Sequence, residues 1–234
     1  MIESLVPAAS TYAGDIDDLF TLIFVLVGFW FVLSEVTFFW LILRFRKKPG
    51  VAGQHITGEK KQEKRWITWP HILVLVCDVF IIVGAVKVWY DIKQYLPPPQ
   101  ETVRVVSQQW AWTFVHPGPD GELDTGDDVT KMNELHVKVG TIYHYLLESK
   151  DVIHDFSVPV FRLKQDAVPG RVITGWFEPT KTGEWDIQCA EICGIGHALM
   201  GGRIFIETPE QHAAWLAEHG AVSVAAFTPS AVEE

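Results

Sequence analysis

The sequence has few cysteines, 3 among 234 residues, which is too few for the disulfide framework of a small secreted domain. It has no Cys-x-x-Cys-His motif, so we expect no c-type haem on this chain. Residues 1–18 contain no Lys or Arg and therefore lack the basic start of a secretory signal, which leaves open whether a leader has been removed. These absences argue against a disulfide-stabilised scaffold and against a haem-carrying cytochrome.

Basic side chains are also scarce in the second part of the chain. Residues 1–99 carry 10 basic and 9 acidic side chains, whereas residues 100–234 carry 9 basic and 20 acidic ones. The formal net charge of −10 therefore comes from residues 100–234. An acidic surface repels nucleic acid and attracts basic partners, so we expect no role in nucleic-acid binding.

Two long apolar runs, residues 19–43 and 67–90, stand out in the first part of the chain. A helix needs about 20 apolar residues to cross the hydrocarbon core of a bilayer, so both runs are predicted to span the lipid bilayer. Glu35 and Asp78 interrupt them; such groups either contact other membrane helices or have local structural roles. Aromatic residues of the kind enriched at membrane interfaces flank the second run: Trp66, Trp69, Trp89 and Tyr90.

The loop between the two runs, residues 44–66, is rich in Lys and Arg and contains only Glu59 and Glu63 as acids. By the positive-inside rule this loop lies in the cytoplasm. The tail 1–18 and everything after residue 90 then lie on the outer side. We expect a bacterial inner (plasma) membrane protein with both termini on the periplasmic side.

A Pro-rich linker, residues 91–100, separates the membrane part from a soluble domain at 101–220, which a tail at 221–234 follows. Short runs rich in Val, Ile, Phe, Trp and Thr predict strands at 102–106, 110–115, 134–139, 142–147, 156–160, 172–177, 184–188 and 202–207. Such spacing is typical of an all-β sandwich or barrel. Residues 209–219 are predicted to be helical, because Thr208 and Pro209 begin an amphipathic segment.

The candidate metal site lies between the last two predicted strands. Two thiols, an imidazole and a thioether fall within twelve residues: Cys189, Cys193, His197 and Met200. Soft sulfur ligands together with imidazole favour copper. Gly194 and Gly196 allow the loop to fold tightly enough for these ligands to converge.

Three other interpretations of these residues are open. In the first, Cys189 and Cys193 form a disulfide in an oxidising compartment. In the second, two Cys and two His hold a zinc ion, although zinc seldom uses Met. A mononuclear blue-copper site needs one Cys, two His and a weak Met, which leaves the second Cys unexplained. Two cysteines can instead bridge two metal ions.

The pattern Cys189-x-x-x-Cys193-x-x-x-His197-x-x-Met200 resembles the dinuclear CuA centre of cytochrome c oxidase subunit II. Segments 149–154, which ends in His154, and 163–171 also resemble that family, as does Gln109-Trp110-Ala-Trp112. So does the order of a two-helix transmembrane hairpin before the soluble domain. The resemblance spans roughly residues 15–218 and implies a cupredoxin-like domain.

The resemblance implies a ligand set and further site residues. Both thiolates bridge the coppers, His154 and His197 each bind one copper, and Met200 and the backbone carbonyl of Glu191 complete the two ions. The Glu191 side chain is expected to reach a Mg²⁺ ion at the interface with the catalytic subunit. The remaining implied residues are Trp110, with Trp112 beside it, for accepting electrons, and Glu63 at the mouth of a proton pathway.

An acidic segment, residues 117–128, departs from the family pattern. Its carboxylates and glycines form a candidate Ca²⁺ loop, with an exposed acidic loop as the alternative. The carboxylates concerned are Asp120, Asp124, Asp127 and Asp128.

The resemblance implies that this chain takes electrons from a cytochrome c-type donor and passes them to haem in a haem–copper subunit I, where O₂ is reduced. Two alternatives stay open. One is the CuA subunit of a related nitric oxide reductase. The other is a membrane-tethered copper carrier or assembly protein with no catalytic partner.

Overall fold

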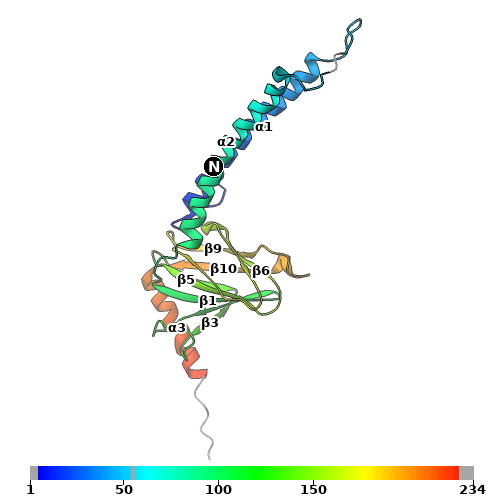
Figure 1. The fold of residues 1–234 in the computed structure, drawn as a ribbon. Coiled ribbons are helices and arrows are strands. Elements are labelled where there is room, and N and C mark those ends of the chain that lie inside the picture. Colours follow the sequence, from blue (N-terminus) through cyan, green and yellow to red (C-terminus); the bar gives the residue numbers. More distant parts are fainter. Residues whose placement is uncertain (1–4, 54–55, 227–234) are drawn as a thin grey trace, which may run out of the picture. The chain divides into compact units, whose positions relative to one another are not determined.

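The computed structural model describes residues 5–53 and 56–226, which divide into two compact units (Figure 1). One unit, Asp15–Tyr90, contains two long helices. Helix α1 spans Ala13–Arg44 and helix α2 spans Lys61–Trp89, with one π-helical turn, Tyr90–Gln94, after it. Both helices are long and apolar enough to cross a membrane.

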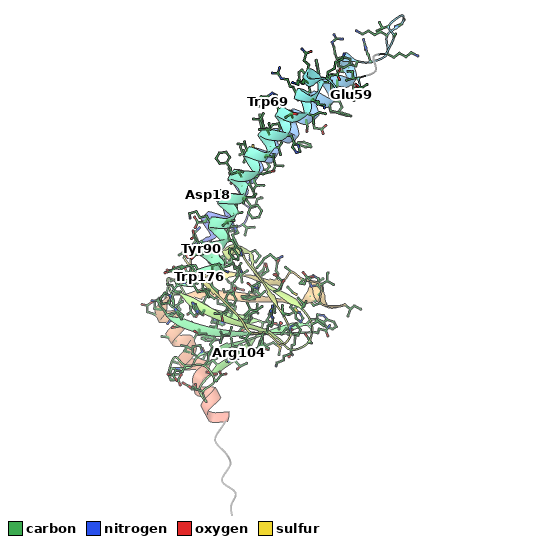
Figure 2. All side chains as sticks on the ribbon, in the orientation of Figure 1. Asp18, Glu59, Trp69, Tyr90, Arg104 and Trp176 are labelled. Atoms are coloured by element: carbon green, nitrogen blue, oxygen red, sulfur yellow. The ribbon has the colours of Figure 1, made fainter. Side chains whose placement is uncertain are left out.

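Helices α1 and α2 lie side by side (Figure 1). A Cβ atom at Gly84 would lie 3.3 Å from Leu19 Cδ1, so glycine allows the two helices to approach closely there. Further along, Trp30 Nε1 donates to Cys77 Sγ at 3.4 Å. Trp69 and Tyr90 lie toward the two ends of α2 (Figure 2), where aromatic side chains meet membrane interfaces.

The second unit is a sandwich of two five-stranded sheets. The first sheet has the order β3-β2-β1-β5-β8 and the second has the order β4-β10-β9-β6-β7. The strands are β1 Glu101–Gln108, β2 Ala111–His116, β3 Val129–Met132, β4 Glu134–Lys138, β5 Tyr143–Ser149, β6 His154–Val158, β7 Leu163–Ala167, β8 Ile173–Phe177, β9 Gly183–Cys189 and β10 Gly201–Glu207. The predicted fold class, two apolar helices followed by an all-β sandwich, is confirmed.

Alternating side chains fill the space between the sheets. Strand β2 buries every second residue, including Trp112 and Phe114, and strand β5 buries Tyr143, Tyr145 and Leu147, as the two-residue period of a strand requires. Strands β3 and β7 were not predicted. Both are short and carry charged residues, so the apolar runs that reveal the other strands are absent from them.

The segment before α1 packs on the sandwich. Ala9 donates its N–H to the Val160 carbonyl at 2.8 Å and accepts from Thr180 N–H at 2.8 Å. Tyr12 is buried and meets Trp176 edge to face, with ring centroids 5.2 Å apart. The sequence gives no apolar periodicity that would predict the position of this segment. Backbone hydrogen bonds to strand connections far away in the sequence hold it in place.

Helix α3 spans Pro209–Ala226 and lies against β3, β4 and β10. A reciprocal capping box begins it: Gln211 N–H donates to Thr208 Oγ1 at 3.3 Å, and Thr208 N–H donates to Gln211 Oε1 at 2.9 Å. Trp215 is buried and stacks on the His136 ring at 4.1 Å. The helix therefore closes one end of the sandwich with an aromatic contact.

Candidate metal centre

The sulfur-rich segment is the loop of the β9–β10 hairpin. Cys189 is the last residue of β9, and β10 begins one residue after Met200. The Cys189 N–H donates to the Met200 carbonyl at 3.1 Å, which closes the loop. Strand β6 brings His154 to the same place, because Phe156 pairs with Cys189 in the sheet. The fold thus joins a histidine 35 positions away to the loop.

The candidate ligand atoms converge on the two cysteine sulfurs. Cys189 Sγ lies 3.9 Å from His154 Nδ1 and 3.3 Å from the Glu191 carbonyl oxygen. Cys193 Sγ lies 3.6 Å from His197 Nδ1 and 3.9 Å from Met200 Sδ. Among the described residues, His154, Cys189 and Cys193 are the one group of three such side chains whose ligand atoms lie within 4.8 Å of one another.

The spacing of the two sulfurs fits metal binding. They lie 3.8 Å apart, far beyond the roughly 2.05 Å of a disulfide bond, and both cysteines are free. A metal–thiolate bond is about 2.3 Å long, so one ion can contact both sulfurs, and each sulfur has its own histidine. The donor chemistry and the spacing of this His/Cys/Cys cluster fit a CuA centre.

His154 is fully buried and is oriented by a carboxylate. Its Nε2 lies 2.8 Å from Asp151 Oδ1. A carboxylate only accepts hydrogen bonds, so Nε2 carries the proton and Nδ1 faces Cys189 with a free lone pair. Burial raises the pKa of Asp151, but hydrogen bonds from His154 and from the backbone of Gln109 and Val152 outweigh it and lower the pKa overall.

Sequence reasoning missed Asp151. The only available signal was its place three residues before His154, within a segment already noted for the histidine. Carboxylates that orient ligand histidines lie outside the ligand set, so a ligand pattern alone does not identify them.

The Cys193 thiol is held in its neutral form without a metal ion. Burial, followed by the neighbouring Cys189 thiol, raises the pKa of Cys193 to about 11. A coordinated thiol is deprotonated by the charge of the cation. A soft cation bound at Cys193 would therefore displace the thiol proton.

Trp110 packs on the loop between β9 and β10, residues 190–200, which we call the metal loop. Its Nε1 donates to the Cys193 carbonyl at 3.2 Å, and the same carbonyl accepts from Gln109 Nε2 at 2.8 Å. A Cβ atom at Gly196 would collide with the Trp110 ring, and one at Gly194, whose φ is +122°, would lie 3.1 Å from it. These glycines therefore serve more than loop folding, because they make room for the tryptophan.

Of the two tryptophans expected to accept electrons, Trp110 is 39% exposed whereas Trp112 is fully buried. The Trp112 ring meets the His154 ring edge to face, with centroids 6.2 Å apart. Trp110 thus reaches the surface, whereas Trp112 packs behind a candidate ligand.

The other predicted site residues lie apart from the sulfur cluster. The Glu191 side chain is exposed. Glu63 accepts a hydrogen bond from Gly58 N–H at 3.1 Å, next to the start of α2. In the acidic segment, Asp124 pairs with Arg104 at 2.7 Å, while Asp120, Asp127 and Asp128 accept hydrogen bonds from within their own loop. The geometry gives no support to the Ca²⁺ prediction or to the Mg²⁺ prediction.

Comparisons with known proteins identify the family of this chain. The family model described as cytochrome c oxidase subunit II, periplasmic domain, matches residues 101–208. The alternative cytochrome c oxidase subunit 2 of Bradyrhizobium diazoefficiens is 33% identical over 232 residues, which cover 90% of this chain and 82% of that relative. The cytochrome c oxidase subunit 2 of Cereibacter sphaeroides is 27% identical over 240 residues, covering 90% and 78%.

Among solved structures, one similar chain is the periplasmic domain of subunit II of the cytochrome oxidase of Bradyrhizobium japonicum. It shares 27% sequence identity at a TM-score of 0.49, and the match covers 55% of this chain and 99% of that one.

Proposed function

Because this chain belongs to the cytochrome c oxidase subunit II family, we propose that it accepts electrons from a cytochrome c-type donor at a dinuclear CuA centre and delivers them to haem in a catalytic subunit. The observation that carries this proposal is the convergence of two free thiols, two imidazole nitrogens, one thioether and one carbonyl on a single loop.

Two ions explain the donor set better than one. Each cysteine sulfur has a histidine of its own, His154 beside Cys189 and His197 beside Cys193. A single tetrahedral zinc or a single blue copper would leave a soft donor unused. Cys189, Cys193, His154 and His197 would hold the copper, which would supply one-electron redox chemistry at this site.

The protein holds these donors in a rigid frame. Residues at both ends of the loop belong to paired strands, and His154 belongs to a strand whose five residues are all buried. Asp151 fixes the imidazole of His154, and Trp110 covers the Cys193 carbonyl. A preorganised ligand set changes little when charge is added or removed, which favours electron transfer.

The surface around Trp110 suits a protein donor. Three apolar side chains of the metal loop are highly exposed: Ile192 at 77%, Ile195 at 96% and Leu199 at 87%. Exposed apolar residues that gather on one loop mark interaction sites. The acidic character of residues 100–234 adds long-range attraction for a basic donor. Trp110 would then carry electrons from the docked donor toward Cys193.

Further parts of the proposal concern the membrane and the partner subunits. The basic loop between α1 and α2 supports an inner-membrane orientation with the sandwich in the periplasm. The family resemblance, rather than the geometry, carries the proposal of a Mg²⁺ ion between Glu191 and a haem–copper subunit I; a carboxylate is the kind of ligand that this hard cation favours. Glu63 at the start of α2 stays a candidate for the mouth of a proton pathway in the same complex.

Two measurements test the proposal. Copper analysis and paramagnetic resonance of the purified complex should give two coppers per chain that share one unpaired electron. Reduced cytochrome c should then reduce the haem of the co-purified partner. A single-copper spectrum would refute the dinuclear site. Isolation without any haem subunit would instead favour a copper carrier, and a partner that reduces nitric oxide would favour a nitric oxide reductase.

A further inference from the structure

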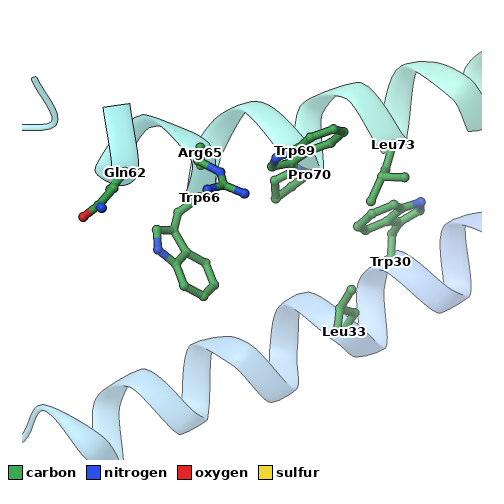
Figure 3. A pocket seen from close by; sticks show the side chains of 8 residues that line it. All are labelled: Trp30, Leu33, Gln62, Arg65, Trp66, Trp69, Pro70 and Leu73. Atoms are coloured by element: carbon green, nitrogen blue, oxygen red, sulfur yellow. The ribbon is translucent and has the colours of Figure 1, made fainter. Parts of the chain in front are cut away.

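The loop-side half of the helix pair contains a cavity of about 540 Å³ between α1 and α2 (Figure 3). Its volume is within the range of about 300–1,000 Å³ that is typical of small-molecule sites. Its lining consists of Trp30, Leu33, Gln62, Arg65, Trp66, Trp69, Pro70 and Leu73. All of these residues belong to the helical unit, and none of them takes part in the copper site.

The cavity has an apolar end and a polar end. Trp30, Leu33 and Leu73 lie at one end, and Gln62 and Arg65 lie at the other, toward the basic loop (Figure 3). Trp66 projects between the two helices, closer to the polar end (Figure 3). The lining thus changes from apolar side chains at one end to the Arg65 cation at the other, with tryptophans between them. Tryptophan is the residue type enriched where lipid tails meet headgroups.

Arg65 has no hydrogen bond or ion pair with any of the described residues, although its neighbours include acidic Glu63. A guanidinium at the membrane interface binds phosphate in a bidentate geometry. Lys60, Lys61 and Lys64 add positive charge next to it. The polar end of the cavity therefore favours a ligand that carries negative charge.

We propose that the cavity between α1 and α2 binds one anionic phospholipid, with the headgroup phosphate on Arg65 and Gln62 and an acyl chain along Trp66, Trp30 and Leu73. Basic pockets between membrane helices on the cytoplasmic side are sites of this kind for acidic headgroups. A zwitterionic lipid fits the apolar end equally well, but Arg65, which has no ion-pair partner among the described residues, and its basic neighbours favour a net negative headgroup. The proposal does not depend on the copper centre.

A photo-crosslinker in place of Trp66 tests the proposal directly. Trp66→benzoylphenylalanine is introduced into the full chain, and the assembled complex is reconstituted in nanodiscs of equal phosphatidylglycerol and phosphatidylcholine. After irradiation, mass spectrometry identifies the molecule attached to residue 66. The expected adduct is phosphatidylglycerol in excess over phosphatidylcholine by about fivefold, the equivalent of about 1 kcal/mol for one basic side chain near the headgroups.

Two substitutions and a second crosslinking position provide the controls. Arg65→Gln should remove the preference for phosphatidylglycerol, whereas Arg46→Gln, which takes the same charge from a loop residue outside the cavity, should keep it. The crosslinker at Phe80, an exposed α2 residue outside the cavity, should attach both lipids without preference. Equal yields of both lipids at position 66 would overturn the proposal, and so would an adduct with a protein chain, because a partner helix would then fill the cavity.

Discussion

Two groups of histidines occupy opposite ends of strand β10, and they behave differently. At the start of β10, His154 and His197 each turn Nδ1 toward a cysteine sulfur, at 3.9 and 3.6 Å. At its end, Glu207 accepts hydrogen bonds from His136 Nδ1 at 2.8 Å and from His212 Nδ1 at 2.9 Å. The first pair lies beside soft thiol sulfurs, whereas the second pair is already hydrogen-bonded to a carboxylate of the protein.

His116 completes the second group. Its Nδ1 donates to the Val129 carbonyl at 3.2 Å, so its Nε2 is free to accept from His136 N–H at 3.0 Å. These buried imidazoles and Trp215 join β2 and β4 to helix α3. The comparison teaches that burial and clustering do not make a histidine a ligand. What matters is whether the ring nitrogen faces a soft sulfur donor that a metal ion can share, or donates its proton to a carboxylate or carbonyl oxygen of the protein.

The largest expected effect comes from removing a bridging thiol. Cys189→Ser should abolish the spectrum of an electron shared between two coppers and reduce bound copper to one ion or none, because serine is a hard and weakly acidic donor. Copper analysis and paramagnetic resonance measure this. Cys77→Ser, which removes the thiol in α2, should leave both signals intact. A Cys189→Ser protein that keeps the shared-electron spectrum would refute the bridging role.

Removing the carboxylate that orients His154 should have the next largest effect. Asp151→Asn should weaken copper binding by about 10–100-fold, as loss of such a carboxylate typically does. Competition with a copper chelator measures the affinity. Asp186→Asn, at an exposed partner of Arg203 in the same sheet, should bind copper like the unaltered chain. Equal affinities in both variants would show that Asp151 plays no part in orienting the ligand.

Crowding the Trp110 ring should slow reduction by the docked donor more than it lowers copper binding. Gly196→Ala places a methyl group against the Trp110 ring and should destabilise the loop by about 1–3 kcal/mol, as overpacking does. Reduction by cytochrome c should slow while the copper content stays the same. Gly201→Ala is the matched control, since its Cβ atom would meet the nearest atom, the Ile187 carbonyl oxygen, at an ordinary 3.5 Å. Unchanged kinetics in Gly196→Ala would argue against Trp110 as the electron acceptor.

The smallest expected effect is that of acid, which should destabilise the second group of histidines and thereby the docking of helix α3. Burial lowers the pKa of His116 to about 3 and that of His136 to about 4. Because these pKa values lie below the value of about 6.5 for an unfolded histidine, the stabilisation is complete above pH 6.5 and is lost as pH falls toward 4. At pH 5 the loss is up to about 2 kcal/mol for each histidine that stays neutral in the folded state.

Amide hydrogen exchange of residues 209–220 in the full chain tests this pH dependence, with rates corrected for intrinsic exchange at each pH. Opening of α3 should become easier between pH 7 and pH 5. His116→Phe keeps an aromatic ring but cannot be protonated, so it should flatten the pH dependence. A flat profile in the unaltered chain would show that these imidazoles are not linked to the docking of α3.

Local signals were sufficient for most of the fold and for part of the site. The apolar runs gave both long helices, and strands rich in β-branched and aromatic residues gave eight of the ten strands. Cys189, Cys193, His197 and Met200 are close in sequence, so their pattern was visible without a fold. Chemistry that depends on neighbours in sequence can be predicted in this way.

Tertiary structure alone decided the rest. The pairing of β6 with β9 brings His154 to the loop, and the register of β2 directs Trp112 inward, while Trp110, just before that strand, lies on the surface. The docking of Ala9 on the sandwich depends on contacts between distant segments, and so does the hydrogen bond of His136 with Glu207. The sequence by itself determined the local part of the candidate ligand set, because Cys189, Cys193, His197 and Met200 lie in one short motif. Only the fold brings His154 beside these thiols and ties His136 and His212 to Glu207, because the partner of each ring nitrogen depends on how the strands and α3 pack.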